Sequence, residues 1–138
     1  MTKMEHALAD TLAGQRVLLL HNRYRVAGGE ERFVDGLERL LTEAGAHVAR
    51  LERSSDSGAA AAARAAGGLL AGGLRPGTVA DVVRRERITV LHAHNIQPTF
   101  GPRALAAARA AGARTVLHLH NHRLYCAIGI ATHAMQGG

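Results

Sequence analysis

Short apolar runs alternate along this chain with longer stretches in which apolar residues recur at helical spacing. Residues 16–20 and 88–91 are nearly continuous apolar runs, as is typical of parallel strands that are buried on both faces. Residues 47–51 alternate between apolar and polar positions, which favours a less buried strand, and residues 115–119 supply a fourth run. The pattern therefore predicts four short strands.

Helical periodicity fills the segments between these runs. Helices are expected at residues 30–44, 58–70, 78–85 and 102–111. The first has acidic residues in its opening turn and is followed by Gly45, which suits the helix dipole and a C-terminal stop. The second is rich in alanine, and the Gly-Gly pairs that follow its centre predict loose ends. Thr78 and Asp81 have the spacing of a capping box, and Pro102 suits a first helical turn.

Strands separated by helices predict an α/β fold, namely a Rossmann-like parallel sheet with helices on both faces. Placing the two most apolar runs at the centre gives the strand order 2-1-3-4, with the strands numbered along the chain. The chain then divides into a flexible lead at residues 1–14 and one domain at residues 15–138.

The composition limits the core and favours anionic partners. Aromatic residues make up 3% of the 138 residues and Trp is absent, so much of the apolar content is alanine, which buries little area. Lysine and arginine number 17 against 11 acidic residues, which fits either a partner with phosphate groups or a solvated basic surface. No nucleic-acid-binding motif is present, and no aromatic residues interleave with the basic ones, so we expect no nucleic-acid partner.

The sequence also bears on the cellular compartment. The single cysteine, Cys126, excludes an internal disulfide framework, and the chain has neither a signal peptide nor an apolar run of membrane length. We expect a cytoplasmic protein, for which a peripheral contact with the inner face of the membrane stays open.

Polar residues gather in three segments that follow predicted strands, at residues 21–29, 92–98 and 120–126. Ligands of parallel α/β sheets bind beyond the carboxyl ends of the strands, so these segments should share one rim. Gly28 and Gly29 precede a helix, where bare backbone and N–H groups suit an anion, although a tight turn also explains them. Their spacing differs from the dinucleotide fingerprint G-x-G-x-x-G, which excludes a nicotinamide or flavin site.

Histidines cluster at the same predicted rim. Residues two apart on a strand point in the same direction, so the pairs His92/His94 and His118/His120 could each present two imidazoles together. We interpret His92 and His118 as ordinary strand residues. Residues beyond the strands are expected to hydrogen-bond a polyhydroxylated or phosphorylated ligand, and these are His94, Asn95, His120 and Asn121. Because these segments hold no carboxylate and no cysteine pair, we expect no bound metal, with a zinc-dependent hydrolase as a lesser alternative.

Three segments in order carry a family resemblance: residues 17–22 (VLLLHN) with 28–31 (GGEE), residues 88–95 (ITVLHAHN), and residues 117–126 (LHLHNHRLYC). They resemble the landmarks of the N-terminal domain of family-four retaining glycosyltransferases, which have the GT-B fold. The resemblance covers about residues 15–130.

The resemblance implies transfer of a sugar from a nucleotide-diphosphate sugar to a glycan, lipid or small-molecule acceptor, with no other cofactor. It implies that His120 is the catalytic residue that reaches the transferred sugar, and that Gly28 and Gly29 approach the donor diphosphate. It further implies an acceptor-binding set that comprises His94, Asn95, Asn121, Arg23, Tyr24 and Arg25.

Members of the family have a C-terminal domain that holds the nucleotide, and this chain ends before it. The resemblance therefore implies that the chain is one half of an enzyme, needs that second domain as a partner, and is inactive alone. An alternative of a different class is a non-catalytic module that binds a phosphorylated or sugar ligand at the same rim.

Overall fold

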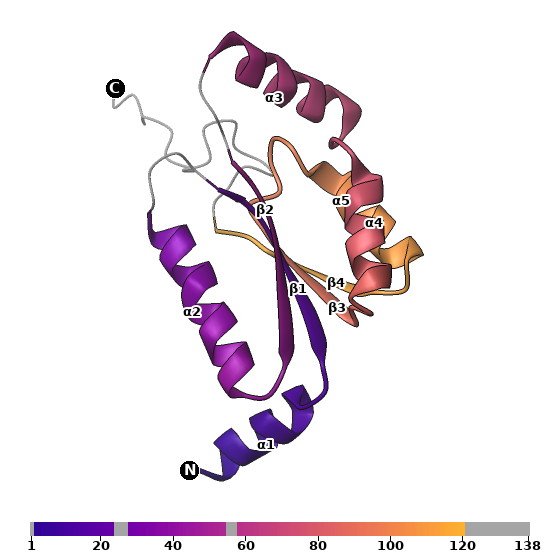
Figure 1. Ribbon diagram of the computed structural model, residues 1–138. Coiled ribbons are helices and arrows are strands. Elements are labelled where there is room, and N and C mark those ends of the chain that lie inside the picture. Colours follow the sequence, from indigo (N-terminus) through magenta and orange to yellow (C-terminus); the bar gives the residue numbers. More distant parts are fainter. Residues whose placement is uncertain (1, 24–27, 55–57, 121–138) are drawn as a thin grey trace, which may run out of the picture.

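The computed structural model describes residues 2–23, 28–54 and 58–120. Its elements follow one another in the order α1 (Lys3–Leu12), β1 (Arg16–Arg23), α2 (Gly29–Glu43), β2 (His47–Ser54), α3 (Ala59–Ala71), α4 (Pro76–Arg85), β3 (Val90–His94), α5 (Gly101–Ala110) and β4 (Arg114–His118). One helix or a pair of helices separates each strand from the next, as Figure 1 shows.

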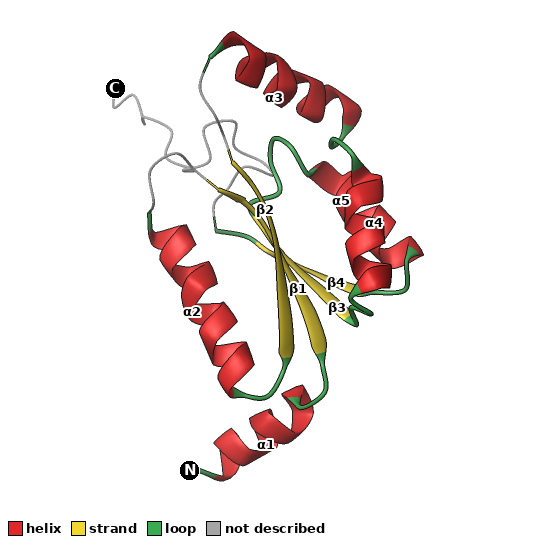
Figure 2. Ribbon diagram, viewed as in Figure 1, coloured by secondary structure: helices red, strands yellow, loops and turns green. Residues whose placement is uncertain are grey.

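The four strands form one parallel sheet in the order β2-β1-β3-β4, which confirms the predicted strand order. Helix α2 covers one face of the sheet, and α4 and α5 cover the other (Figures 1 and 2). The predicted α/β fold class, a Rossmann-like parallel sheet with helices on both faces, is therefore confirmed.

Successive side chains of β1 point to opposite faces of the sheet, which divides the core into two layers. Leu18 and Leu20 face α4 and α5, where they join a cluster that includes Val79 and Phe100, whereas Leu19 packs on the side of α2. All five side chains are fully buried. Burying a leucine or phenylalanine contributes about 1.5–3 kcal/mol, so one short apolar run stabilises both layers of the fold.

The strands extend farther toward the rim than the apolar pattern predicts. β1 ends at Arg23 and β3 at His94, so the segments expected to be loops from residues 21 and 92 begin in strand. The reason is that His21 and Asn22 continue the pairing of β1 although their side chains are polar, and both are fully buried. At α4 the predicted capping box is wrong, because the helix begins earlier, with Arg75 as N-cap and Pro76 in its first turn.

The residues before β1, expected as a flexible lead, include helix α1, which the sequence analysis did not predict. Its Leu12 packs against the apolar cluster between α2 and the sheet. Among the described residues, no helix is long and apolar enough to span a bilayer.

Glycines allow α3, α4 and α5 to meet closely. Gly72 ends α3 in the left-handed conformation, with φ of 68°. Gly73 has φ of 124°, and a side chain there would overlap the carbonyl group of Phe100. A side chain at Gly101 would overlap the backbone of Gly72 in the same way. The glycine-rich stretch that predicted a loose helix end is therefore a close-packed junction.

Candidate functional site

The carboxyl ends of β1, β3 and β4 meet at one edge of the sheet, beside the beginning of α2. The parallel register places His94 next to His21 on one side and next to His118 on the other. His120 follows two residues after the end of β4, and Gly28 is the N-cap of α2. The described residues of the three segments predicted to share a rim lie at the ends of these neighbouring strands.

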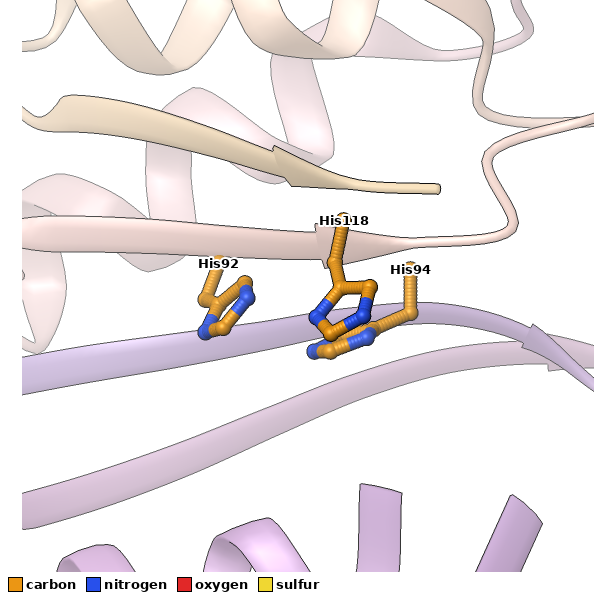
Figure 3. A group of neighbouring side chains, drawn as sticks. All are labelled: His92, His94 and His118. Atoms are coloured by element: carbon orange, nitrogen blue, oxygen red, sulfur yellow. The ribbon is translucent and has the colours of Figure 1, made fainter. Parts of the chain in front are cut away.

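Four imidazoles gather on the face of the sheet that α2 covers, and we call them the histidine cluster: His92, His94, His118 and His120. The ring centroids of His92 and His94 are 4.4 Å apart, and those of His118 and His120 are also 4.4 Å apart. Between the two strands, the His94 and His118 centroids are 5.3 Å apart. Figure 3 shows the rings of His92, His94 and His118 on the same side of β3 and β4. Phe33 of α2 lies against the cluster, 4.8 Å from the His118 ring and 5.1 Å from the His120 ring.

His94 occupies the centre of the histidine cluster. Its side chain is fully buried, and its Nδ1 atom lies 2.8 Å from Nε2 of His120. Burial, followed by the neighbouring imidazoles, lowers the pKa of His94 to about 3. Burial also lowers the pKa values of His92 and His120. At neutral pH these three rings are therefore uncharged.

A buried imidazole and two carboxylates join β1 to α2. His21 is fully buried, with Nδ1 3.5 Å from an oxygen of Glu30 and Nε2 3.7 Å from an oxygen of Glu31. Burial lowers the pKa of His21, and this effect outweighs the opposing attraction of Glu31. The other oxygen of Glu31 accepts a hydrogen bond of 2.7 Å from the N–H of Gly28. The carboxylates are thereby held inward at the start of α2.

Asn95 ties the end of β3 to the end of β1. Its side-chain amide donates a hydrogen bond of 2.8 Å to the carbonyl oxygen of Asn22, and the Asn22 N–H donates one of 3.1 Å to the Asn95 carbonyl oxygen. The Thr99 hydroxyl donates to the Asn22 side-chain oxygen at 2.6 Å. Asn95 has a left-handed backbone, with φ of 39°, and is 9% exposed. It shapes the rim, and its contact with an acceptor stays a prediction.

The other predicted site residues are only partly described. Arg23 ends β1 with a half-exposed side chain whose Nη1 atom lies 3.8 Å from an oxygen of Glu52. Tyr24, Arg25 and Asn121 lie outside the described residues. The rim therefore brings together His94, His120, Asn95 and the two glycines, and leaves those three positions untested.

Three histidines at the rim, His21, His92 and His118, were not predicted as site residues. His92 and His118 do lie within strands, as predicted, but their rings face the same side as that of His94. The spacing of two residues that pairs His92 with His94 also applies to residues 17, 19 and 21 of β1, and this was the signal available for His21.

Comparison of the chain with protein-family models, curated proteins and solved structures finds no match. What the rim can bind is therefore inferred from the chemistry of its side chains. Uncharged imidazoles can donate or accept hydrogen bonds with a sugar hydroxyl, and their lone pairs can bind a metal ion.

Proposed function

We propose that this chain is the acceptor-side domain of a retaining glycosyltransferase of the GT-B type. It would help to transfer a sugar from a nucleotide-diphosphate sugar to a glycan, lipid or small-molecule acceptor. Besides the sequence resemblance, one observation carries the proposal: Gly28 and Gly29 stand at the start of a helix on the histidine-rich rim, and the described fold does not need glycine at either position.

The argument for the glycines comes from the space around them. Gly28 has φ of −123°, which any residue adopts, and a first side-chain carbon there would lie 3.5 Å from the Glu31 carboxylate, an ordinary contact. At Gly29, a first side-chain carbon would have no described atom within 4 Å. Gly73, by contrast, is required by both its backbone angle and its neighbours. Close approach of a ligand at the helix start would account for the bare backbone at residues 28 and 29.

A diphosphate is the ligand that suits this position. The beginning of an α-helix carries about half a positive charge and offers backbone N–H groups to an anion. Glu30 and Glu31 follow directly, but their side chains are only 11% and 3% exposed and lie against His21. One oxygen of Glu31 accepts the Gly28 N–H, so a diphosphate would meet the N–H groups that follow in the first turn of the helix.

Under this proposal, His120 contacts the transferred sugar. The hydrogen bond with the buried His94 holds its ring, so the imidazole needs little reorganisation to meet a substrate hydroxyl. Sugar transfer with retention in this family depends on positioning donor and acceptor and on stabilising the leaving diphosphate, and a preoriented imidazole next to a helix start fits that task.

Binding of a donor fragment can be followed on the chain itself by titrating the ¹⁵N-labelled protein with uridine diphosphate in an NMR experiment. The amide signals of residues 28–31 should shift and saturate together. Gly29→Ala should weaken this binding at least about tenfold, because its methyl group would occupy the space proposed for the diphosphate.

Gly36→Ala is a matched control, because Gly36 also lies in α2 and its added methyl group would meet no described atom within 4 Å. Neither substitution should destabilise the fold, since alanine favours a helix over glycine by up to about 1 kcal/mol. Equal affinities for the two variants, or no shifts at residues 28–31, would contradict the proposed diphosphate site.

A further inference from the structure

The histidine cluster holds more imidazoles than the proposed sugar transfer uses. His92, His94 and His118 each offer one ring nitrogen, and these three nitrogens lie within 4.8 Å of one another. We propose that His92, His94 and His118 form a binding site for a divalent transition-metal ion of the zinc type. This inference stands on the cluster alone and does not depend on the proposed function.

The backbone holds the three residues in a suitable arrangement. His94 and His118 are register partners on adjacent parallel strands, and His92 precedes His94 by two residues, so its ring is on the same face. Zinc–nitrogen bonds of about 2.0–2.1 Å place tetrahedral ligand atoms about 3.3 Å apart. Rotations that move the rings by about 1 Å would bring the three nitrogens to that spacing.

Unpartnered nitrogens inside the cluster support this site. The Nε2 atoms of His92 and His94 are buried and have no hydrogen-bond partner among the described residues. Leaving a buried polar atom without a partner destabilises the fold, and a coordinated ion would remove that cost.

The hydrogen bond between His94 and His120 completes the arrangement. If Nδ1 of His94 carries the proton and donates it to Nε2 of His120, the Nε2 atom of His94 is the free lone pair. A histidine that binds a metal through one nitrogen commonly donates a hydrogen bond from the other, which fixes its tautomer. His120 is therefore a positioning residue for this site, and a water molecule or an anion would take the fourth position.

A cavity reaches one of the three proposed ligands. A cavity of about 250 Å³ opens on the α2 side of the sheet, and His92 is part of its wall together with residues of α1 and α2. The expectation of no bound metal rested on the lack of carboxylate and thiolate ligands near the histidine pairs. The structure combines the two pairs, so that three imidazoles come together without a carboxylate or thiolate.

The test is a metal titration of the full, untagged chain after removal of metals with a chelator. Co²⁺ is followed by its visible absorption, Zn²⁺ is then used to displace it, and calorimetry gives the stoichiometry. We expect one ion per chain, with absorption that indicates nitrogen ligands. The absence of saturable binding up to roughly 100 µM Co²⁺ and Zn²⁺ would overturn the proposal, since that corresponds to a weak interaction.

Variants show whether the cluster holds the ion. His118→Ala should weaken binding at least about tenfold because it removes a ligand, and His120→Ala should weaken it about 10-fold to 100-fold through the orientation of His94. His47→Ala is the control, because His47 begins β2 with a half-exposed side chain far from the rim end of the strand. His118→Gln, checked by circular dichroism, replaces His118→Ala if the alanine variant does not fold. Equal affinities for wild type and a folded His118 variant would place the ion elsewhere and end the proposal.

Discussion

Acidification should destabilise the metal-free fold through the histidine cluster, and His94 should carry a measurable part of the effect. The pKa of His94 is lowered to about 3 by burial and by the imidazoles of His92, His118 and His120 around it. A histidine in an unfolded chain has a pKa of about 6.5, so the unfolded state binds the proton first. Between about pH 6.5 and pH 3, protonation of this histidine therefore stabilises the unfolded state and not the folded state. The free energy of unfolding falls as the pH falls.

The magnitude follows from these two pKa values. Lowering the pH from about 7.5 to 5.5 should reduce the free energy of unfolding by about 1.4 kcal/mol through His94 alone. His21, His92 and His120, whose pKa values are also lowered, act in the same direction and increase the total loss. A small domain has only about 5–15 kcal/mol of stability, so a change of this size shifts a urea midpoint clearly.

Urea unfolding at several pH values, with a chelator present to exclude bound metal, measures this effect. His94→Gln removes the titrating group, and although it will lower stability overall, its loss between pH 7.5 and 5.5 should be about 1.4 kcal/mol smaller than that of wild type. His47→Gln controls for loss of a histidine outside the cluster. A pH dependence in His94→Gln as steep as in wild type would refute the assignment of a buried, uncharged His94.

Two further substitutions test the packing that supports the rim. Gly73→Ala should lower the free energy of unfolding by about 2–3 kcal/mol, because the new methyl group would overlap backbone atoms and φ of 124° is strained for alanine. Gly67→Ala in α3 is the control and should be tolerated, and urea unfolding measures both variants. Arg50→Ala should cost about 1–2 kcal/mol, because the Arg50 guanidinium on β2 binds Asp35 and Glu38 of α2 at 2.7 and 2.8 Å. That loss should shrink at high salt, and an equal loss at all salt concentrations would point to packing instead of charge.

Most of the fold could be predicted from the sequence because the apolar pattern and the rules for βαβ connections act together. The runs at residues 16–20 and 88–91 had to lie at the centre of a parallel sheet, and this fixed the order of all four strands. The apolar pattern did not predict the full length of β1, because the buried residues at its end are polar. Asn22 extends β1 because Thr99 and Asn95 hydrogen-bond its side chain and its carbonyl oxygen, and His21 lies against Glu30 and Glu31 of α2. Such long-range contacts leave no local signal.

In the histidine cluster, too, one part of the arrangement could be predicted from the sequence and another part could not. The sequence showed that His92 and His94 share a face of their strand, and the structure agrees. The predicted strand order paired β3 with β4, but the sequence could not show the register that places His94 beside His118, because that register also depends on how the connecting helix α5 packs on the sheet. Two residues that were interpreted as ordinary strand positions thus became members of the cluster.

The proposed function is tested most directly by sugar transfer in a complemented enzyme, in which this chain is supplied with a donor-binding domain of a GT-B glycosyltransferase. Turnover of wild type, His120→Ala and His47→Ala is measured under identical conditions and normalised to folded protein. His120→Ala should lower turnover roughly tenfold to a thousandfold, which is the range that one preorganised polar contact supplies, while His47→Ala should leave it unchanged. Unchanged turnover in His120→Ala would contradict the account and remove this histidine from the mechanism.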